Sequence, residues 1–296
     1  MCMSEVVPNG DTIFNKVERM RSDKSKLRPD DHVQLPLWGS EGRGLPNALA
    51  RCGLFSARRD ESENEAREYL PGVEIPALSN YRINYRGEEL RQDDSAVFMQ
   101  LVHLAREQPL GSRVSFTAHS FLKDIGWATN GEAYSRLRAC FERLKANYIQ
   151  ISTKDNSGGY AKSLIRAFYW QNDQGETLQY WSIELEPDII KLYGDTTYTV
   201  IQWRQRKMIG TRAVLALWLH SFLATHFDPM PISVEKYKEL SRSRCKTLFH
   251  FKAQLKTALE RLIEVGFLDS YQITDKNLVV LTRSRLKPLP ATVTTA

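Results

Sequence analysis

A stretch near the C-terminus carries positive charge with no acid to balance it. No Asp or Glu occurs from Leu240 to Leu259, and five cations fall inside this stretch: Arg242, Arg244, Lys246, Lys252 and Lys256. Guanidinium and ammonium groups bind phosphate, and both can also bind guanine in the major groove of DNA. A charge run is usually a solvated helix face, but a run without acids on a helix that also packs a core favours nucleic acid.

Other side chains around this run could also contact a duplex. The first turns of the predicted helix expose polar groups next to its lysines, namely Lys246, Thr247, His250 and Gln254. Gln can pair bidentately with adenine, whereas Arg and Lys supply phosphate and guanine contacts. The preceding turn, which contains Ser243, offers two guanidiniums and two hydroxyls to phosphates, and Lys276 adds a cation at the tip of a predicted hairpin.

The positive charge of the chain is concentrated in its last third. Residues 201–296 hold 16 Lys and Arg against 7 Asp and Glu, whereas residues 1–200 hold 25 against 28. Hydrophobic residues make up 42% of the 296 residues and the mean hydropathy is −0.42, which suits packed cores in a soluble protein. No apolar stretch has the length of a membrane span and the polar N-terminus does not resemble a signal peptide, so we expect a cytoplasmic protein without membrane contact.

The elements expected in the second half would position these side chains. Thr211 and Ser233 each precede a helical pattern, and a long amphipathic helix is predicted over Thr247–Glu264. Gly266 ends that helix, and residues 267–282 are expected to form a β-hairpin. This order is typical of the winged-helix variant of helix-turn-helix, whose third helix enters the major groove while the hairpin lies along the backbone or minor groove.

The same order of elements is predicted once before, in the first half. Asp93 and Asp94 are candidate N-caps of an apolar helix, Thr117 caps a short helix, and a longer helix follows a turn at Asn130-Gly131. The cations of this unit lie on the longer helix and on the hairpin predicted to follow it, and they are Arg136, Arg138, Lys145, Lys154 and Lys162. We expect this unit to contact DNA mainly at the backbone, with dimerisation as its other plausible role.

The fold class predicted from these patterns is α+β, with two tandem winged-helix domains and a disordered N-terminal tail. The predicted boundaries are 1–44 for the disordered region, 45–90 for a leading segment and linker, 91–200 and 201–285 for the two domains, and 286–296 for a tail. The second domain is expected to be the main DNA reader. The same order of elements also serves in protein–protein modules, which leaves that alternative open.

Four segments carry a resemblance to a known family. They are Leu45–Arg59, Tyr85–Asp94, Phe121–Trp127 and Asn130–Gly131. Together they resemble the TrfA family of broad-host-range plasmid replication initiators, over about residues 33 to 283. The resemblance implies binding of double-stranded origin DNA at direct repeats (iterons), melting of the adjacent AT-rich DNA with capture of the single strand, and recruitment of the host initiator and the replicative helicase. It also implies copy-number control through a dimer–monomer balance with the monomer active, in the bacterial cytoplasm.

The resemblance implies a function for a short apolar segment in the N-terminal region. Gln34-Leu35-Pro36-Leu37-Trp38 is similar to the Gln-Leu-x-Leu-Phe peptide by which initiators and polymerases hold the bacterial sliding clamp. An extended peptide could insert Leu37 and Trp38 into an apolar pocket while the amide of Gln34 bonds at its rim. The alternative is a hydrophobic staple that packs onto the folded part of the chain.

Patterns for catalysis and for metal binding are not found in the sequence. The cysteines Cys2, Cys52, Cys140 and Cys245 lie far apart and no His pair has metal-ligand spacing, so we expect neither metal nor cofactor. The Gly-rich run 39–44 lacks the Gly-Lys-Ser/Thr ending of a nucleotide-binding loop. We therefore expect a non-enzymatic DNA-binding initiator. The alternatives are a winged-helix transcriptional repressor and an origin-nicking endonuclease.

Overall fold

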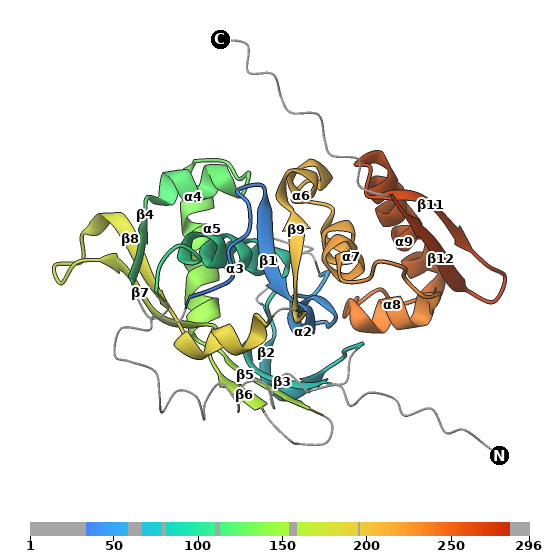
Figure 1. Cartoon of the computed structure of the whole chain (residues 1–296), viewed down its shortest axis with the longest axis horizontal. Helices are drawn as coiled ribbons and strands as arrows, with labels where there is room; N and C mark the ends of the chain where they lie inside the picture. The colour runs from blue at the N-terminus through green and yellow to red at the C-terminus, as the bar shows by residue number, and fades with distance from the viewer. Residues whose placement is uncertain are drawn as a thin grey trace, which may run out of the picture.

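Two apolar cores organise the chain. The computed structural model describes residues 34–58, 67–78, 81–109, 113–153, 159–194 and 196–284. In these residues one core runs from Leu35 to Trp203 and the other from Ile209 to Leu281. Helices and antiparallel sheets contribute to both cores, so the fold is of the mixed α+β class, and the two halves lie side by side (Figure 1).

The two larger sheets of the first half are antiparallel, and helices pack with them. The four-stranded sheet has the order β2 (Tyr69–Ile75), β3 (Tyr81–Glu88), β5 (Tyr148–Thr153) and β6 (Gly159–Lys162). The three-stranded sheet has the order β4 (Arg113–Phe116), β8 (Thr177–Leu185) and β7 (Ile165–Gln171). The helices are α3 (Gln92–Ala105), α4 (Ala118–Asp124), α5 (Gly131–Lys145) and the 3₁₀ helix η1 (Pro187–Leu192).

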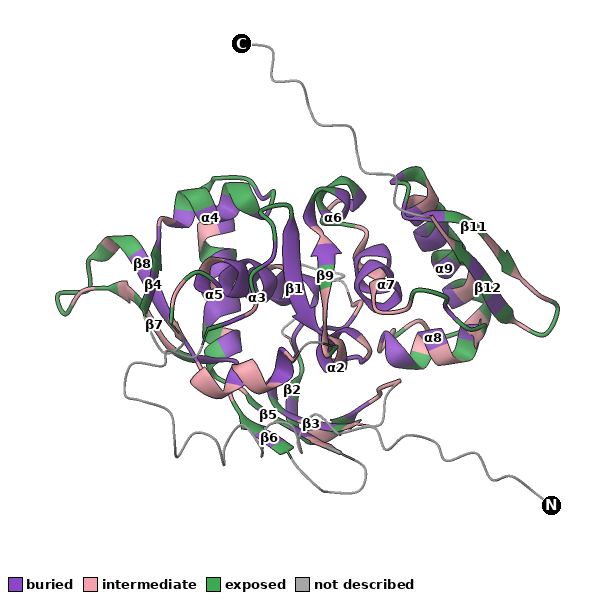
Figure 2. Cartoon of the chain, viewed as in Figure 1, coloured by how far each residue is buried: buried purple, intermediate pink, exposed green. Residues whose placement is uncertain are grey.

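The second half is smaller and follows a similar plan. Its helices are α6 (Trp203–Ile209), α7 (Val214–Ala224), α8 (Val234–Leu240) and α9 (Leu248–Glu264). Its three-stranded sheet has the order β10 (Ile232–Ser233), β12 (Leu278–Arg283) and β11 (Leu268–Ile273). Nearly all of α7 is buried, as Figure 2 shows, because α7 lies between the first half and α9.

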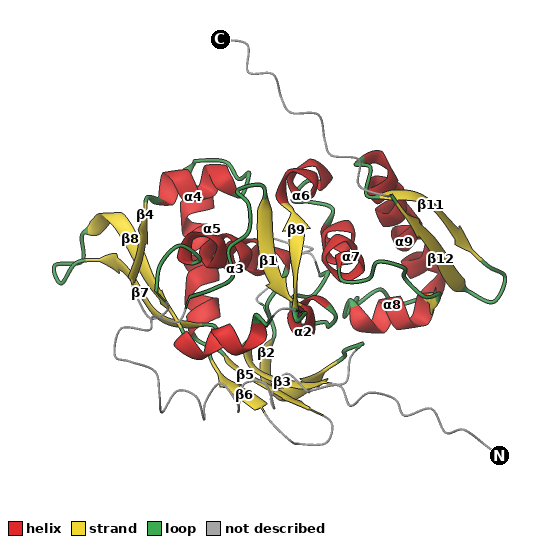
Figure 3. Ribbon diagram, in the orientation of Figure 1, coloured by secondary structure: helices red, strands yellow, loops and turns green. Residues whose placement is uncertain are grey.

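The predicted repetition of element order is confirmed. Helix, strand, two helices and a hairpin occur as α3, β4, α4, α5 and β7–β8, and again as α7, β10, α8, α9 and β11–β12. In each three-stranded sheet the short first strand pairs with the last strand of the hairpin, and these sheets lie at opposite ends of the molecule (Figure 3). One prediction is corrected, because the equivalent hairpin of the first half is β7–β8. The pair β5–β6, where Lys154 and Lys162 were expected to form the hairpin, instead extends the β2–β3 sheet.

Residues 34–44 belong to the folded first half, which corrects the prediction that the disordered region reaches residue 44. Strand β1 (Gly42–Pro46) pairs with β9 (Tyr198–Gln202), and the short helix α2 (Asn47–Ala50) follows β1. The indole of Trp38 stacks on the ring of Tyr193, with ring centroids 6.1 Å apart. The segment predicted as a leading segment and linker at 45–90 is also structural, since it supplies β2 and β3 to the first core.

Side-chain caps define most of the helix starts that the sequence predicts. The side chains of Thr117, Asn130, Ser233 and Thr247 accept hydrogen bonds from backbone N–H groups at the starts of α4, α5, α8 and α9. Thr211 is not a cap, because α7 begins only at Val214 and the preceding turn belongs to the connection from α6. Gly266 has φ +70 directly after α9, which is the left-handed conformation that ends a helix most easily at glycine.

Within the described residues, none of the helices has the length and apolar character that crossing a bilayer requires.

Candidate nucleic-acid interface

Helix α9 presents its predicted polar face to solvent. Its apolar stripe is fully buried and comprises Phe251, Leu255, Leu259 and Leu262. The helix begins at a capped end, where the hydroxyl oxygen of Thr247 accepts from the backbone N–H of His250 at 3.2 Å. The side chains that remain exposed on the outer face include Lys246, Thr247, His250, Gln254 and Lys256. The first turn of α9 contains no acid, so its N-terminal end combines the positive end of the helix dipole with these lysines.

The adjoining hairpin is fixed to α9 by a lysine that we expected to face DNA. Lys252 is half-buried, and its ammonium group donates to the side-chain oxygen of Asn277 at 2.7 Å. Asn277 has φ +56 and lies in the tight turn between β11 and β12. Lys252 therefore sets the position of the hairpin relative to α9, whereas Lys276 at the same turn is exposed.

The prediction that Arg242 contacts phosphate is wrong. Arg242 has φ +52, and its side chain, only 10% exposed, points toward Glu89 of the first half at 3.8 Å. A Cβ atom on Gly53 would lie 2.7 Å from the Arg242 side chain, so this glycine permits the close approach. Burial lowers the pKa of Arg242. The side chain joins the two halves and does not face solvent.

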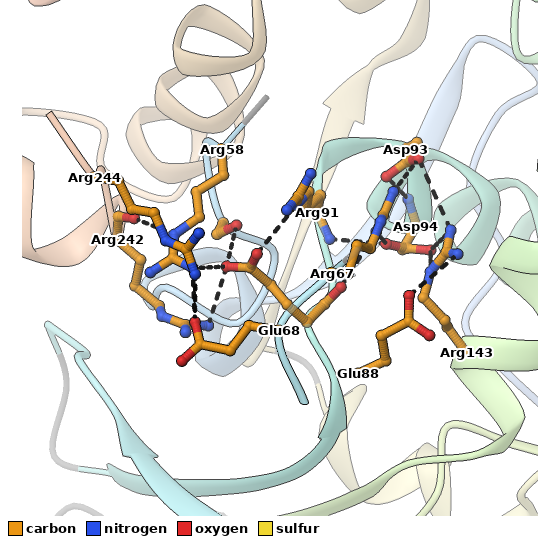
Figure 4. A network of polar contacts seen from close by, with 12 residues as sticks. Arg58, Arg67, Glu68, Glu88, Arg91, Asp93, Asp94, Arg143, Arg242 and Arg244 are labelled. Carbon is orange, nitrogen blue, oxygen red and sulfur yellow. Dashed lines mark hydrogen bonds and ion pairs between the residues drawn. The ribbon is translucent and has the colours of Figure 1, made fainter. Parts of the chain in front are cut away.

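Arg244 is bound by Glu68 of the first half but stays half-exposed. Its guanidinium donates to the carboxylate of Glu68 at 2.7 Å, and Arg58 bonds the same carboxylate at 3.1 Å (Figure 4). These two arginines lower the pKa of Glu68. Ser243 supports the turn locally, since its hydroxyl oxygen accepts from the backbone N–H of Cys245 at 3.2 Å. The turn between α8 and α9 is therefore docked on the first half, and the exposed cations of α9 begin at Lys246.

Three of the cations predicted for the first unit have partners within the first half. Arg136 lies over the ring of Trp127 at 4.1 Å, and Arg138 lies over the ring of Trp170 at 4.4 Å. The ammonium group of Lys162 contacts the carboxylates of Glu186 at 2.6 Å and Asp188 at 3.0 Å, which raises the pKa of Lys162. Two acidic side chains thus already surround the ammonium group of Lys162. Lys145 is exposed, and Lys154 lies outside the described residues.

Asp93 and Asp94 form the centre of a buried ion-pair network at the start of α3 (Figure 4). Arg67 bonds both carboxylates at 2.6 Å, and Arg143 bonds Asp94 at 2.9 Å. Asp94 also accepts from the backbone N–H of Arg91 at 2.8 Å. The N-cap of α3 is Arg91, which corrects the prediction that Asp93 or Asp94 is the N-cap, although both lie in the first turn and Asp94 completes a capping box with Arg91.

These carboxylates do not form a convincing metal site. Donor atoms of Asp93, Asp94 and Cys140 lie within 4.8 Å of one another. The guanidinium of Arg143 nevertheless donates to the Cys140 sulfur at 3.2 Å, and burial keeps the pKa of that thiol well above its usual value. Arginines thus already supply the positive charge that a cation would bring, and the thiol is held in its protonated form. The donor set does not suit a metal ion.

A cleft of about 1420 Å³ lies between the two halves. It is lined by the connection from α4 to α5, the start of α5, and the connection from α6 to α7. Three exposed cations line it, namely Arg136, Lys207 and Arg212. The sequence patterns did not single out Lys207 and Arg212, because they lie on elements whose proximity to α5 depends on the tertiary fold.

The clamp-like peptide 34–38 packs onto the folded first half, which is the arrangement that the alternative hypothesis of a hydrophobic staple predicts. Leu35 is 2% exposed and Trp38 is 9% exposed, whereas Leu37 is 68% exposed. The indole N–H of Trp38 donates to Nδ1 of His103 on α3 at 3.1 Å, and the amide of Gln34 donates to a backbone carbonyl at 2.9 Å. Trp38, one of the two side chains that would enter a clamp pocket, is thus already buried in the chain's own core, as is Leu35.

A known family accounts for most of the length of this chain. The sequence profile of the TrfA protein family matches residues 25–283. The chain belongs to the TrfA family. This confirms the resemblance inferred from the sequence segments around residues 45–59 and 85–131.

One individual relative is consistent with this assignment, and one solved structure shares the fold. Over 240 residues this TrfA-family chain is 26% identical to the plasmid replication initiator protein TrfA of Escherichia coli, and the match covers 80% of this chain and 61% of the relative's length. A crystal structure of selenomethionine derivatives of domains 2 and 3 of RctB aligns with a TM-score of 0.50 at 14% identity. That alignment covers 76% of this chain and 94% of the RctB chain, and at this identity it concerns the fold alone.

Proposed function

We propose that this TrfA-family chain initiates plasmid replication by binding direct repeats in the plasmid origin, without catalysis. The observation that carries the proposal is the acid-free, solvent-exposed face at the N-terminal half of α9, in a chain that matches a replication-initiator family over residues 25–283. The relative from Escherichia coli is named a plasmid replication initiator, which supports the same activity here.

In this proposal both repeated units are winged-helix domains, and α9 is the main reading helix. Lys246 and Lys256 would contact phosphates beside the major groove, while His250 and Gln254, which lie between them along the chain, would bond base edges. Lys252 holds the hairpin against α9, so that Lys276 at the hairpin turn reaches the backbone beside the groove. The first unit adds backbone contacts through Lys145 and contributes to self-association.

Opening of the AT-rich DNA would follow from binding and bending energy. A duplex bent across two DNA-binding units stores deformation energy, and that energy is released most easily at flexible steps. Capture of the exposed single strand and recruitment of the host initiator and helicase complete the proposed sequence. The balance between dimer and active monomer would regulate it.

Recruitment of the sliding clamp by Gln34–Trp38 requires that this segment detach from α3, because Leu35 and Trp38 are buried. Leu37→Ala tests this contribution while leaving the packed Trp38 in place. We expect it to weaken binding of the full chain to purified clamp in surface plasmon resonance. Unchanged binding would exclude the segment from clamp recruitment.

Footprinting across the origin of the plasmid that encodes the chain tests the main proposal. We expect protection of several direct repeats on one face of the duplex. Protection of a single palindrome upstream of a gene, with replication unaffected by loss of the protein, would favour a transcriptional repressor. Relaxed or cut product after incubation with Mg²⁺ and supercoiled origin DNA would favour a nicking endonuclease.

A further inference from the structure

Phe249 is the exception among the large apolar side chains of α9. Although the apolar stripe that ends at Leu262 is fully buried, 79% of Phe249 is exposed. Among the ring contacts of the described residues it has one neighbour, the edge-on ring of His250, with centroids 5.6 Å apart. The sequence patterns did not single out Phe249, although its position off the apolar stripe is visible in the helical periodicity. Packing in the core therefore does not explain why α9 has a phenylalanine at this position.

The surroundings of Phe249 restrict what could cover it. The ring lies in the first turn of α9, one turn before the exposed Ala253 on the same side of the helix, and the exposed Lys246 precedes the helix by two residues. No acidic residue occurs between Leu240 and Leu259, and the positive end of the helix dipole adds to the lysines. A partner for this surface must therefore be anionic on both sides of the ring and must offer a small apolar group at the centre.

A DNA duplex that contains thymine meets both requirements. Phosphates line the two edges of the major groove, and the C5 methyl group of thymine is the apolar group that the groove displays. Phenylalanine and alanine side chains both contact that methyl group well, because burial removes apolar surface of ring and methyl from water. The other base pairs display hydrogen-bonding groups at the same edge, which a phenyl ring cannot satisfy.

We propose that Phe249 is a specificity-determining residue that packs on thymine methyl groups in the major groove, with Ala253 extending the contact by one helical turn. This rests on the proposed function, because it places α9 in the groove. The choice of DNA sequence would then depend on this apolar contact as well as on the proposed hydrogen bonds of His250 and Gln254. Binding should accordingly depend on a chemical group that carries no charge and makes no hydrogen bond.

Replacing thymine by deoxyuridine tests the proposal, since it removes the C5 methyl and nothing else. Duplexes that the full-length chain binds are first selected from a random pool, and the winning duplex is then made with deoxyuridine in place of each thymine in turn. We expect affinity in fluorescence anisotropy to fall about fourfold at each thymine that Phe249 contacts. Phe249→Ala should bind the thymine duplex more weakly and should lose this dependence on the methyl group.

A matched variant separates this contact from general effects of removing an exposed ring. Phe227→Ala removes a phenylalanine that is 91% exposed. Phe227 lies far from the hairpin turn, because the backbone carbonyl of its neighbour His226 accepts a hydrogen bond from Arg283 at the other end of β12. This variant should keep the full dependence on thymine methyl groups. Both rings are exposed, so neither substitution leaves a cavity and both variants should fold.

Three results would count against the inference in distinguishable ways. Equal binding of thymine and deoxyuridine duplexes by the unmodified chain would overturn it, as would a Phe249→Ala variant that keeps the methyl dependence. If Phe249→Ala leaves DNA binding unchanged but shifts the dimer–monomer balance in analytical ultracentrifugation, the ring is a contact between copies and the inference is wrong. Failure to enrich any duplex would instead overturn the proposed function itself.

Discussion

Some lysines of the described residues lie beside carboxylates that balance their charge, whereas others lie on an exposed surface without acidic residues. Lys246 and Lys256 are exposed on the acid-free face of α9, whereas the ammonium group of Lys162 lies between two carboxylates at 2.6 and 3.0 Å. Only a cation without an internal partner can release a counterion from DNA phosphate at full effect. The residues that lead the DNA contact should therefore be Lys246 and Lys256.

Replacing Lys246 and Lys256 together by alanine should weaken binding to origin repeats and flatten its salt dependence. Each phosphate contact that is lost should reduce the slope of log K against log salt by about 0.9. Titrations at several salt concentrations measure this slope, and Lys162→Ala serves as the control that should keep it. A slope that is the same in the double variant and in the unmodified chain would place the phosphate contacts elsewhere.

His103 should make the folded state sensitive to acid. Burial, together with the nearby charges of Arg43 and Arg106, lowers its pKa to about 3. The folded state therefore binds fewer protons than the unfolded state between pH 6.5 and 3, so stability is present at neutral pH and is lost as the pH falls through this window. One such histidine accounts for about 2 kcal/mol of lost stability at pH 5.

The His103→Asn variant isolates this contribution from those of the other buried histidines. We expect the loss of unfolding free energy between pH 7 and pH 5, measured by urea titration, to be smaller in the variant than in the unmodified chain. The slope against pH is the readout, since the substitution also removes the hydrogen bond from Trp38. Identical slopes would show that His103 is not held neutral by the fold.

At the scale of elements, α9 depends on its first turn. Thr247→Ala removes the hydroxyl that bonds the backbone N–H of His250 and should lower the unfolding free energy by about 1 kcal/mol, whereas Thr247→Ser should retain most of it. Thr257→Ala, at an exposed site in the middle of the same helix, is the control. Urea unfolding measures all three variants. Equal loss in Thr247→Ala and Thr257→Ala would show that the cap does not stabilise α9.

Elements set by local signals were predictable from the sequence. Helices α5 and α9 combine a side-chain cap with an apolar stripe, and the β11–β12 hairpin has Asn277 in its turn. Strand β1 was missed because its partner β9 is far away in sequence, with Gly42 opposite Gln202, and no local pattern marks such a pairing. The Thr211 prediction failed because Thr211 lies in the connection between α6, which the sequence patterns did not single out, and α7, which begins only at Val214.

The candidate DNA-binding site also has a part that the sequence predicts and a part that it does not. The exposed face at Lys246, His250 and Gln254 follows from helical periodicity alone, so it could be predicted. The inward course of Arg242 could not, because it depends on a positive φ and on Glu89, which lies in the other half of the chain. The sequence around a cation in a basic run does not show whether its side chain contacts DNA or forms an ion pair within the fold.

At the scale of the whole molecule, acidic residues of the first half fix the turn before α9. Glu89 is fully buried and contacts Arg58 at 2.9 Å and Arg91 at 3.1 Å, with Arg242 at 3.8 Å, whereas Glu68 is half-exposed and contacts Arg244. Buried ions that lose their partner cost far more than exposed ones. The two glutamates should therefore contribute very differently to stability.

Glu89→Gln should lower the unfolding free energy by about 3–5 kcal/mol, because it leaves buried guanidiniums without their anion. Glu68→Gln should cost less than about 1 kcal/mol, because water already screens that pair. Urea unfolding followed by tryptophan fluorescence measures both variants. Equal losses would contradict the assignment of Glu89 as the buried anchor between the halves.

The central claim, that α9 lies in the groove of a defined duplex, is tested most directly by a DNA-cleaving iron chelate attached to the helix. Gln254→Cys carries the probe in a background with Cys2→Ser and Cys245→Ser, since Cys52 and Cys140 are buried. Met208→Cys is the control, because the Met208 carbonyl bonds Arg261 at the opposite end of α9. We predict strand cleavage inside each origin repeat from position 254 and little from position 208. Cleavage that is equal from both positions, or absent from position 254 while the repeats are bound, would contradict the account.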